Sequence, residues 1–280
     1  MRNTKTAELV LTALFTAIIV IMAYTPLGYI PLGIINATII QIPVILGSLF
    51  CGPKKGGFLG FVFGFTSFLK NTITPATASA FVFSPVLASS VVGPSGIFKS
   101  AFICFVPRIL VGIVPYFVYV GIRKLIQSKN RKVWASILNL LIGVFLFVGI
   151  RAFVLRKNPE ATTLALVLGL VIAVVVAVVL EIVSLMKSGA SVSFIYAAVA
   201  GAMTNTLLVM FGIFFLYKEA YAEAIGKAGS EVLSVITGVI SFNGVIEAIV
   251  SGIIVTALGL VLVRMKPIGK SEAVAEAVEK

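Results

Sequence analysis

The sequence contains no histidine and no aspartate, and only 11% of its 280 residues are charged. The usual metal ligands and most catalytic pairs of side chains are therefore absent. The two cysteines, Cys51 and Cys104, stand in apolar surroundings without the spacing of metal ligands, so they predict neither a disulfide nor a metal site. No GxxxxGK[ST] phosphate loop is present, which argues against ATP hydrolysis by this chain. We expect no enzymatic activity and no cofactor.

Apolar residues make up 60% of the chain, and the mean hydropathy is +1.15. Several apolar runs reach the roughly 20 residues that a bilayer-spanning helix needs. The sequence therefore predicts an all-α integral membrane protein with about eight spans. The second span is short and polar, so it is either broken or continuous from residue 30. The predicted spans are 6–24, 36–50, 56–72, 97–122, 133–155, 162–186, 193–217 and 232–263.

The net charge of +12 would suggest a nucleic-acid partner in a soluble protein, but here the cations cluster between the spans. With a cytoplasmic N-terminus, the cytoplasmic segments hold 14 of the 22 Lys and Arg, and the outer connections hold four. This excess predicts that both termini lie in the cytoplasm of a prokaryotic cell, with the chain in its cell membrane. The first apolar segment lacks a cleavage site and is expected to remain as a span. We expect no nucleic-acid partner.

We expect one membrane domain with four consecutive parts. The first four spans and their outer loops occupy 1–128, a two-helix transmembrane hairpin 129–190, the last two spans 191–265 and a cytoplasmic tail 266–280. The hairpin is interpreted as an insertion at the edge of the bundle, because its second helix is almost entirely Leu, Val and Ala. The uncharged outer segment 73–96 contains five serines and is predicted to fold over the bundle as a lid.

The third span combines glycines with phenylalanines and ends at a cation and an amide. Gly57, Gly60 and Gly64 lie close to one face, which predicts close approach of a neighbouring backbone. Lys70 and Asn71 follow where the helix leaves the apolar zone. They either form an ordinary helix end with a snorkelling lysine or lie at the mouth of a binding pocket.

Polar side chains also occur at membrane depth, where they are costly unless they have partners. Arg108, Asn205 and Glu247 lie near the middles of the fourth, seventh and eighth spans. Asn243 is one turn before Glu247, and Tyr116 is expected on the face of Arg108. Two interpretations remain open: Arg108 and Glu247 neutralise each other as a buried ion pair, or the whole group binds a ligand.

Several short motifs carry a resemblance to a known family. They are Ala13 and Ala17 in an AxxxA pattern, Gly52-Pro53-Lys54-Lys55-Gly56, Phe68-Leu69-Lys70-Asn71, Pro107-Arg108-Ile109-Leu110, Thr204-Asn205-Thr206 and Asn243-Gly244-Val245-Ile246-Glu247-Ala248. Together they resemble the substrate-binding S component of an energy-coupling factor (ECF) vitamin transporter, most closely the pantothenate type. The resemblance covers roughly 1–125 and 193–265. Because family members have six spans, it implies a six-helix bundle to which the hairpin is added.

The resemblance implies high-affinity binding of a vitamin from outside the cell. The S component then associates with an ECF scaffold membrane subunit and two ATPase subunits, which hydrolyse the ATP, and topples in the lipid bilayer to release its substrate inward. In the family the AxxxA face contacts the scaffold subunit, which here implies contacts through Ala13 and Ala17.

A pantothenate-like ligand would explain the polar residues. Either Lys70 or Arg108 would meet the carboxylate, asparagines would serve the amide and hydroxyls, and aromatic rings would enclose the apolar part. The predicted substrate-binding residues are Lys70, Asn71, Phe83, Arg108, Tyr116, Asn205, Asn243 and Glu247.

Two other classes of function compete with this interpretation. A proton-coupled secondary transporter of a small organic anion would use Glu247 as its proton carrier, but it would need matching pairs of interrupted helices, which are not evident. An integral-membrane enzyme would have to rely on Glu, Lys, Arg, Tyr or Ser alone. Which vitamin is bound, whether the energising module is shared and what the hairpin does stay open.

Overall fold

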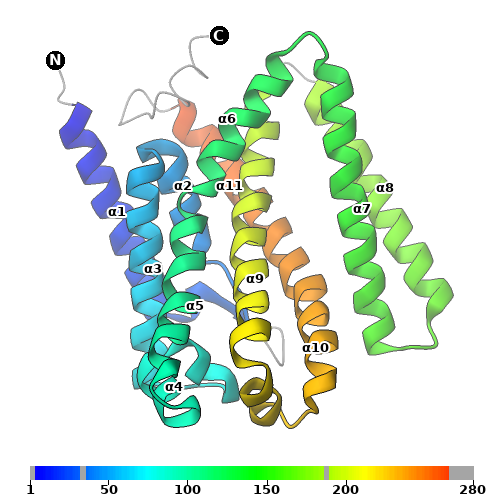
Figure 1. Cartoon of the computed structure of the whole chain (residues 1–280). Helices are drawn as coiled ribbons and strands as arrows, with labels where there is room; N and C mark the ends of the chain where they lie inside the picture. The colour runs from blue at the N-terminus through cyan, green and yellow to red at the C-terminus, as the bar shows by residue number, and fades with distance from the viewer. Residues whose placement is uncertain (1–3, 32–35, 186–188, 265–280) are drawn as a thin grey trace.

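The computed structural model describes residues 4–31, 36–185 and 189–264 of the chain. It is a helical bundle in which α1 begins and α11 ends at the same end (Figure 1). The helices are α1 (Thr4–Tyr24), α2 (Gln41–Cys51), α3 (Pro53–Ile73), α4 (Pro85–Val92), α5 (Ser95–Val111), α6 (Val114–Gln127), α7 (Arg131–Lys157), α8 (Thr162–Leu185), α9 (Gly189–Ala224), α10 (Val232–Val239) and α11 (Val245–Arg264). Short elements complete the order: the 3-10 turns η1 (Pro26–Gly28), η2 (Ala78–Phe83) and η3 (Gly229–Glu231), the strands β1 (Tyr29–Pro31) and β2 (Asn36–Thr38), and a π-helical turn, η4 (Ile240–Gly244).

The predicted all-α class is confirmed, and within the described ranges six helical segments are long and apolar enough to cross a membrane. The predicted helix over 36–50 is wrong at its start, because residues 36–38 pair with β1 as an antiparallel strand and the helix begins at Gln41. At 11 residues α2 is shorter than a spanning helix. The count of eight spans stays a prediction. The predicted tail, 266–280, and the end of the sixth span at 186 lie outside the described residues.

The sequence predicts one helix over 97–122, whereas the structure divides it into α5 and α6. The chain leaves the α-helix at Gly112 and Ile113. Pro115 then lies in the first turn of α6, where its missing N–H costs nothing because that position has no intrahelical acceptor. Residues on opposite sides of this break do not share the face that a continuous helix would give them.

Glycines on α3 bring it into direct contact with the backbone of α5. A Cβ added at Gly56, Gly60 or Gly64 would overlap the carbonyl oxygen of Gly112, Arg108 or Cys104, respectively. These glycines are four residues apart and therefore share one face of the helix. The predicted backbone approach is confirmed at Gly60 and Gly64, while Gly57 faces the side chains of Ile113 and Ile109.

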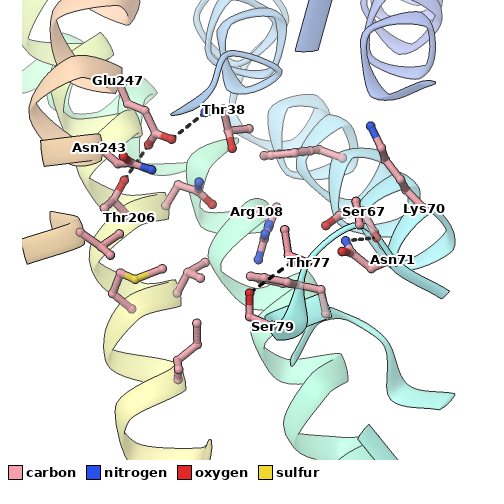
Figure 2. A pocket seen from close by; sticks show the side chains of 18 of the residues that line it. Thr38, Ser67, Lys70, Asn71, Thr77, Ser79, Arg108, Thr206, Asn243 and Glu247 are labelled. Carbon is pink, nitrogen blue, oxygen red and sulfur yellow. Dashed lines mark hydrogen bonds between the residues drawn. The ribbon is translucent and has the colours of Figure 1, made fainter. Parts of the chain in front are cut away.

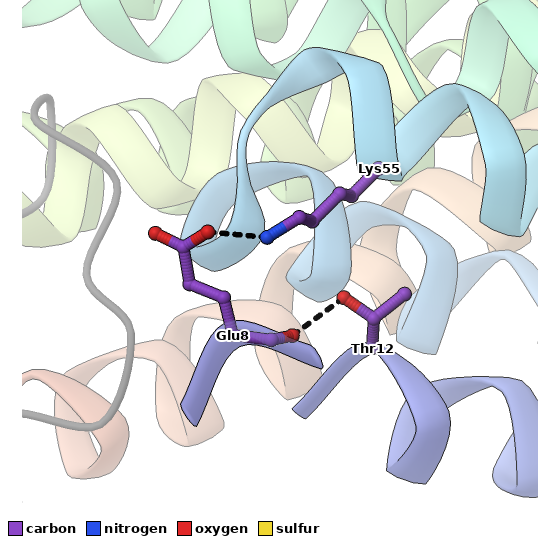
Figure 3. Close-up of polar contacts among 3 residues, drawn as sticks. All are labelled: Glu8, Thr12 and Lys55. Carbon is purple, nitrogen blue, oxygen red and sulfur yellow. Dashed lines mark hydrogen bonds and ion pairs between the residues drawn. The ribbon is translucent and has the colours of Figure 1, made fainter. Parts of the chain in front are cut away.

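Two lysines of α3 tie α1 to the bundle, one at each end. The Lys55 ammonium forms an ion pair with the Glu8 carboxylate, whose backbone carbonyl accepts a hydrogen bond from the Thr12 hydroxyl (Figure 3). Near the other end of α1, Lys70 Nζ donates to the Ala23 carbonyl at 2.9 Å. The α1 face that meets the bundle is buried at Phe15, Ile19 and Ala23, and the opposite face is exposed. The exposed residues are Leu9, Val10, Ala13, Leu14, Ala17, Val20 and Ile21.

The outer segment 73–96 is folded against the bundle, and part of it is helical. It forms η2 and α4, and its Phe81 and Val82 are buried. Two side chains of α5 hold its backbone: the Ser100 hydroxyl donates to the Val82 carbonyl at 2.9 Å, and the Cys104 thiol donates to the Phe83 carbonyl at 3.0 Å. The segment is thus an ordered cover, consistent with its lack of charge.

Helices α7 and α8 lie side by side at one edge of the bundle (Figure 1). A chain of polar contacts joins them to α9. The Glu181 carboxylate accepts hydrogen bonds from Ser136 Oγ (2.8 Å) and Asn139 Nδ2 (2.6 Å), and Asn139 Oδ1 accepts one from the Tyr196 hydroxyl (2.9 Å). These contacts make the hairpin an attached part of the bundle. That it is an insertion stays a prediction.

Replacing Gly60 with alanine should destabilise the protein, because the new methyl group would overlap the Arg108 carbonyl. Overpacking of this kind costs about 1–3 kcal/mol. The matched control is Gly121→Ala on α6, where no atom lies within 4 Å of an added Cβ. Thermal unfolding in detergent should show a lower midpoint for Gly60→Ala alone, and equal midpoints would contradict the proposed packing.

Asn139→Leu should also lower the unfolding midpoint, since it leaves the Tyr196 hydroxyl and one Glu181 oxygen without their partner. The stranded hydroxyl of Tyr196, which is 8% exposed, costs about 1–3 kcal/mol, and the half-buried carboxylate of Glu181 costs less. The double variant Asn139→Leu, Glu181→Leu removes that carboxylate and should recover part of the loss. A double variant less stable than Asn139→Leu would show that the contacts that Glu181 keeps, among them the one from Ser136, outweigh the loss of Asn139 as its partner.

Candidate functional site

A cavity of about 600 Å³ lies between α3, α5, α9 and α11, with η2 and the chain after α1 completing its wall. Figure 2 shows two groups of polar side chains on opposite sides of it, with Arg108 between them. One group is Thr206, Asn243 and Glu247, and the other is Ser67, Lys70 and Asn71. The apolar wall includes Phe63, Phe83, Val209, Met210, Ile213 and Val239.

Arg108 is held by its own helix and by two aromatic rings. Pro107 lies inside α5 and has no N–H, so it cannot donate the helical hydrogen bond to the Ile103 carbonyl. Arg108 Nη1 donates to that carbonyl instead, at 2.5 Å. The guanidinium carbon lies 5.6 Å from the ring centre of Phe63 and 5.0 Å from that of Phe83. With 6% of its surface exposed, Arg108 is a buried cation whose orientation is fixed.

The end of α3 supplies a second cation and an amide. Lys70 lines the cavity while its ammonium donates to the Ala23 carbonyl. Asn71 Nδ2 donates to the Ser67 carbonyl one turn earlier, at 2.8 Å, so the amide is held against its own helix. Lys70 thus lines the cavity and holds the end of α1 at the same time.

Glu247 lies on the opposite side and is 5% exposed. Each carboxylate oxygen accepts one hydrogen bond at 2.7 Å: Oε1 from the Thr38 backbone N–H and Oε2 from the Thr206 hydroxyl. Asn243 reaches the cavity from the π-helical turn η4, a distortion that is frequent at functional sites. On the next turn of α11, Ser251 does not line the cavity and accepts from Gln41 Nε2.

Asn205 lies on α9 beside Thr206 and is 7% exposed. Its Oδ1 is buried and has no hydrogen-bond partner among the described residues. A buried acceptor in this state is costly, and a ligand donor or a water molecule would satisfy it. Asn205 therefore offers a buried acceptor at the cavity wall.

Among the described residues that line the cavity, the charged side chains are those of Lys70, Arg108 and Glu247. They are two cations and one carboxylate. Arg108 and Glu247 are each held by neighbours other than the opposite charge. The surplus of one positive charge in a buried space favours a ligand with a single negative charge.

Seven of the eight predicted binding residues line the cavity. They are Lys70, Asn71, Phe83, Arg108, Asn205, Asn243 and Glu247. Tyr116 does not, because the break between α5 and α6 removes it from the face of Arg108; its ring packs edge-on against Phe117 at 5.6 Å. No role was predicted for Thr206, although it follows Asn205 in a motif. Thr38 contributes its backbone N–H, which no side-chain pattern reveals.

A scan against family models matches residues 7–159 to "ECF transporter, substrate-specific component". The chain belongs to this family. It is accordingly a multi-pass membrane protein of a transporter family, consistent with its six long apolar helical segments. The matched range includes α7, so it extends into the region that the sequence analysis placed outside the resemblance.

Two relatives share sequence with part of this ECF component. One is the pantothenic acid transporter PanT of Lactococcus lactis subsp. cremoris, 40% identical over 124 residues, which are 42% of this chain and 61% of the relative. The other is the pantothenate transporter PanT of Leuconostoc mesenteroides subsp. mesenteroides, 29% identical over 136 residues, 46% of this chain and 57% of the relative. The alignments thus span about three fifths of each relative.

Proposed function

We propose that this chain is the high-affinity pantothenate-binding subunit of an ATP-driven ECF-type uptake transporter. The observation that carries the proposal is the cavity, whose two cations and one carboxylate leave one positive charge to be balanced. Pantothenate is a monoanion with one carboxylate, one amide and two hydroxyls. The two relatives named as pantothenate transporters support the same substrate.

The carboxylate would be met by Lys70 or Arg108 on the α3 and α5 side of the cavity. A guanidinium can bind a carboxylate through two parallel hydrogen bonds, and the rings of Phe63 and Phe83 fix its plane. The side-chain amides of Asn71, Asn205 and Asn243 would form hydrogen bonds with the polar middle of the substrate. Phe83 would also contact its apolar carbons.

The partners would be an ECF scaffold membrane subunit and two ATPase subunits that hydrolyse the ATP. The proposed scaffold contact is the exposed α1 face, where Ala13 and Ala17 permit close approach of another helix. Eight spans with both termini in the cytoplasm, and a hairpin inserted at the edge of the bundle, complete the proposal. That α1 begins and α11 ends at one end of the bundle supports an even number of crossings (Figure 1).

Lys70→Met should weaken pantothenate binding, because it removes a cation from the cavity wall. Truncating one partner of a buried charge pair costs about 2–5 kcal/mol. Lys227→Met is the matched control: it makes the same charge change at an exposed lysine outside the cavity. Calorimetric titration of the purified chains measures both, and the uncharged alcohol analogue of pantothenate should bind the parent weakly.

Absence of pantothenate binding to the parent protein would contradict the proposed function. Unchanged affinity of Lys70→Met would leave the function standing and assign the carboxylate to Arg108 alone. Equal affinity of the parent for the acid and its alcohol analogue would show that the cavity does not recognise the carboxylate.

Ala17→Trp and Ala13→Trp should abolish ATP-dependent uptake and leave pantothenate binding intact, since bulk on this face prevents close helix contact. Val171→Trp, on the exposed face of α8, is the control for adding an indole to a lipid-facing helix. Uptake by cells that express equal amounts of each variant is the measurement. If Ala13→Trp and Ala17→Trp both support the same uptake as the parent protein, α1 is not part of the partner interface.

A further inference from the structure

Hydrogen-bond acceptors predominate on the α9 and α11 side of the cavity. An ionised carboxylate offers about four lone-pair positions. For Glu247 the described residues fill two of them, one on each oxygen, with the Thr38 N–H and the Thr206 hydroxyl. The buried Oδ1 of Asn205, on the same side, has no partner among the described residues. This side therefore has room for two or three further donors.

Hydrogen-bond donors predominate on the α3 and α5 side. Arg108 and Lys70 carry eight N–H groups between them by their chemistry, and both line the cavity. The contacts described for them go to the carbonyls of Ile103 and Ala23 and to two aromatic rings. The cations thus lie on one side of the cavity and the carboxylate on the other, as Figure 2 shows for Lys70 and Glu247.

We infer that Glu247 sets the orientation of the substrate and determines specificity at its uncharged end. The hydroxyl-bearing end points toward α9 and α11 and donates hydrogen bonds to Glu247 and Asn205. The carboxylate end points toward Arg108 and Lys70. This inference rests on the proposed function. It adds which end of the substrate is recognised by each side of the cavity.

When Glu247 is ionised, its negative charge makes this orientation exclusive. Its carboxylate is buried and fixed by donors from two separate segments, β2 and α9, so it cannot turn away from a ligand. Like charges at close range repel strongly in a buried site, where solvent screening is weak. A second carboxylate in place of the terminal hydroxyl would meet that charge, whereas the hydroxyl satisfies it.

The test is a cycle of two proteins and three ligands measured by titration calorimetry, with one control protein and with the alcohol analogue of pantothenate as a fourth, control ligand. The proteins are the parent and Glu247→Gln. The ligands are pantothenate, the analogue in which hydrogen replaces the terminal hydroxyl, and the analogue in which that terminal carbon is a carboxylate. Glu231→Gln, which neutralises an exposed carboxylate outside the cavity, is the control for the charge change.

In the parent and in Glu231→Gln, loss of the terminal hydroxyl should weaken binding about tenfold or more, and the added carboxylate about a hundredfold. In Glu247→Gln, loss of the hydroxyl should weaken binding by less than about threefold, because the acceptor of that hydroxyl is already altered. The penalty for the added carboxylate should shrink by at least about tenfold. The preference for the acid over its alcohol analogue should not change, because that end faces Arg108 and Lys70.

Equal penalties in the parent and Glu247→Gln would overturn the inference while leaving pantothenate binding, and hence the proposed function, intact. If Glu247→Gln does not fold, Asn205→Asp decides the matter. This near-isosteric change adds negative charge to the same side and should weaken binding of the dicarboxylate about tenfold more than that of pantothenate. An equal effect of Asn205→Asp on both ligands would overturn the inference.

Discussion

The contact between α3 and α5 fixes the position of the buried arginine on which the cavity depends. Three glycines of α3 meet backbone carbonyl oxygens, two of them in α5 and one at Gly112 directly after it, and one of the two in α5 belongs to Arg108 itself. The approach is set by backbone atoms, which have no rotamers to adjust, so the two helices have a single close-packed distance. Pro107 then frees the Ile103 carbonyl for the guanidinium. Backbone chemistry at consecutive turns of α5 thus fixes both the depth and the direction of the cation.

The same helix, α3, also positions α1. Lys55 contacts Glu8 and Lys70 contacts Ala23, and in both pairs the partners are 47 residues apart in the sequence. The two contacts are therefore separated by the same number of residues on α1 as on α3. Lys70 belongs to two sites at once, because it lines the cavity and holds the end of the helix whose outer face is exposed. A change in the surroundings of this ammonium would act on both the cavity and α1.

Much of the candidate site could be predicted from the sequence, because polar residues at membrane depth are few and must find partners. Arg108, Asn205 and Glu247 stand out for this reason, and all three line the cavity. Tyr116 was assigned through helical periodicity, which holds only within an unbroken helix. The break lies at Gly112, whose backbone contacts that of Gly56, far away in the sequence. Its local signal is Pro115, which suits the first turn of a new helix better than the interior of a long one.

The elements missed by sequence reasoning are those whose role is carried by the backbone. The β1 and β2 pair is three residues long on each strand and contains a proline, so it lacks the alternation that predicts a strand. Its Thr38 contributes an N–H that any residue other than proline would supply. The π-helical turn likewise shifts Asn243 relative to α10 without a distinctive residue type. Side-chain patterns therefore identify which polar groups line the cavity and leave open how the backbone completes it.

The cost of removing these groups from water is met when the chain folds, before any ligand arrives. Arg108 and Glu247 are each more than nine tenths buried, and each keeps part of its hydrogen-bonding capacity directed at the cavity wall by fixed neighbours. A ligand that supplies an anion on one side and hydroxyl donors on the other therefore gains charge-assisted hydrogen bonds without ordering the protein groups that make them. A molecule lacking either end would gain such contacts on one side only. In the proposed function, the separation of the two cations from the carboxylate would orient the substrate, because the groups that bind its ends lie on opposite sides of the cavity.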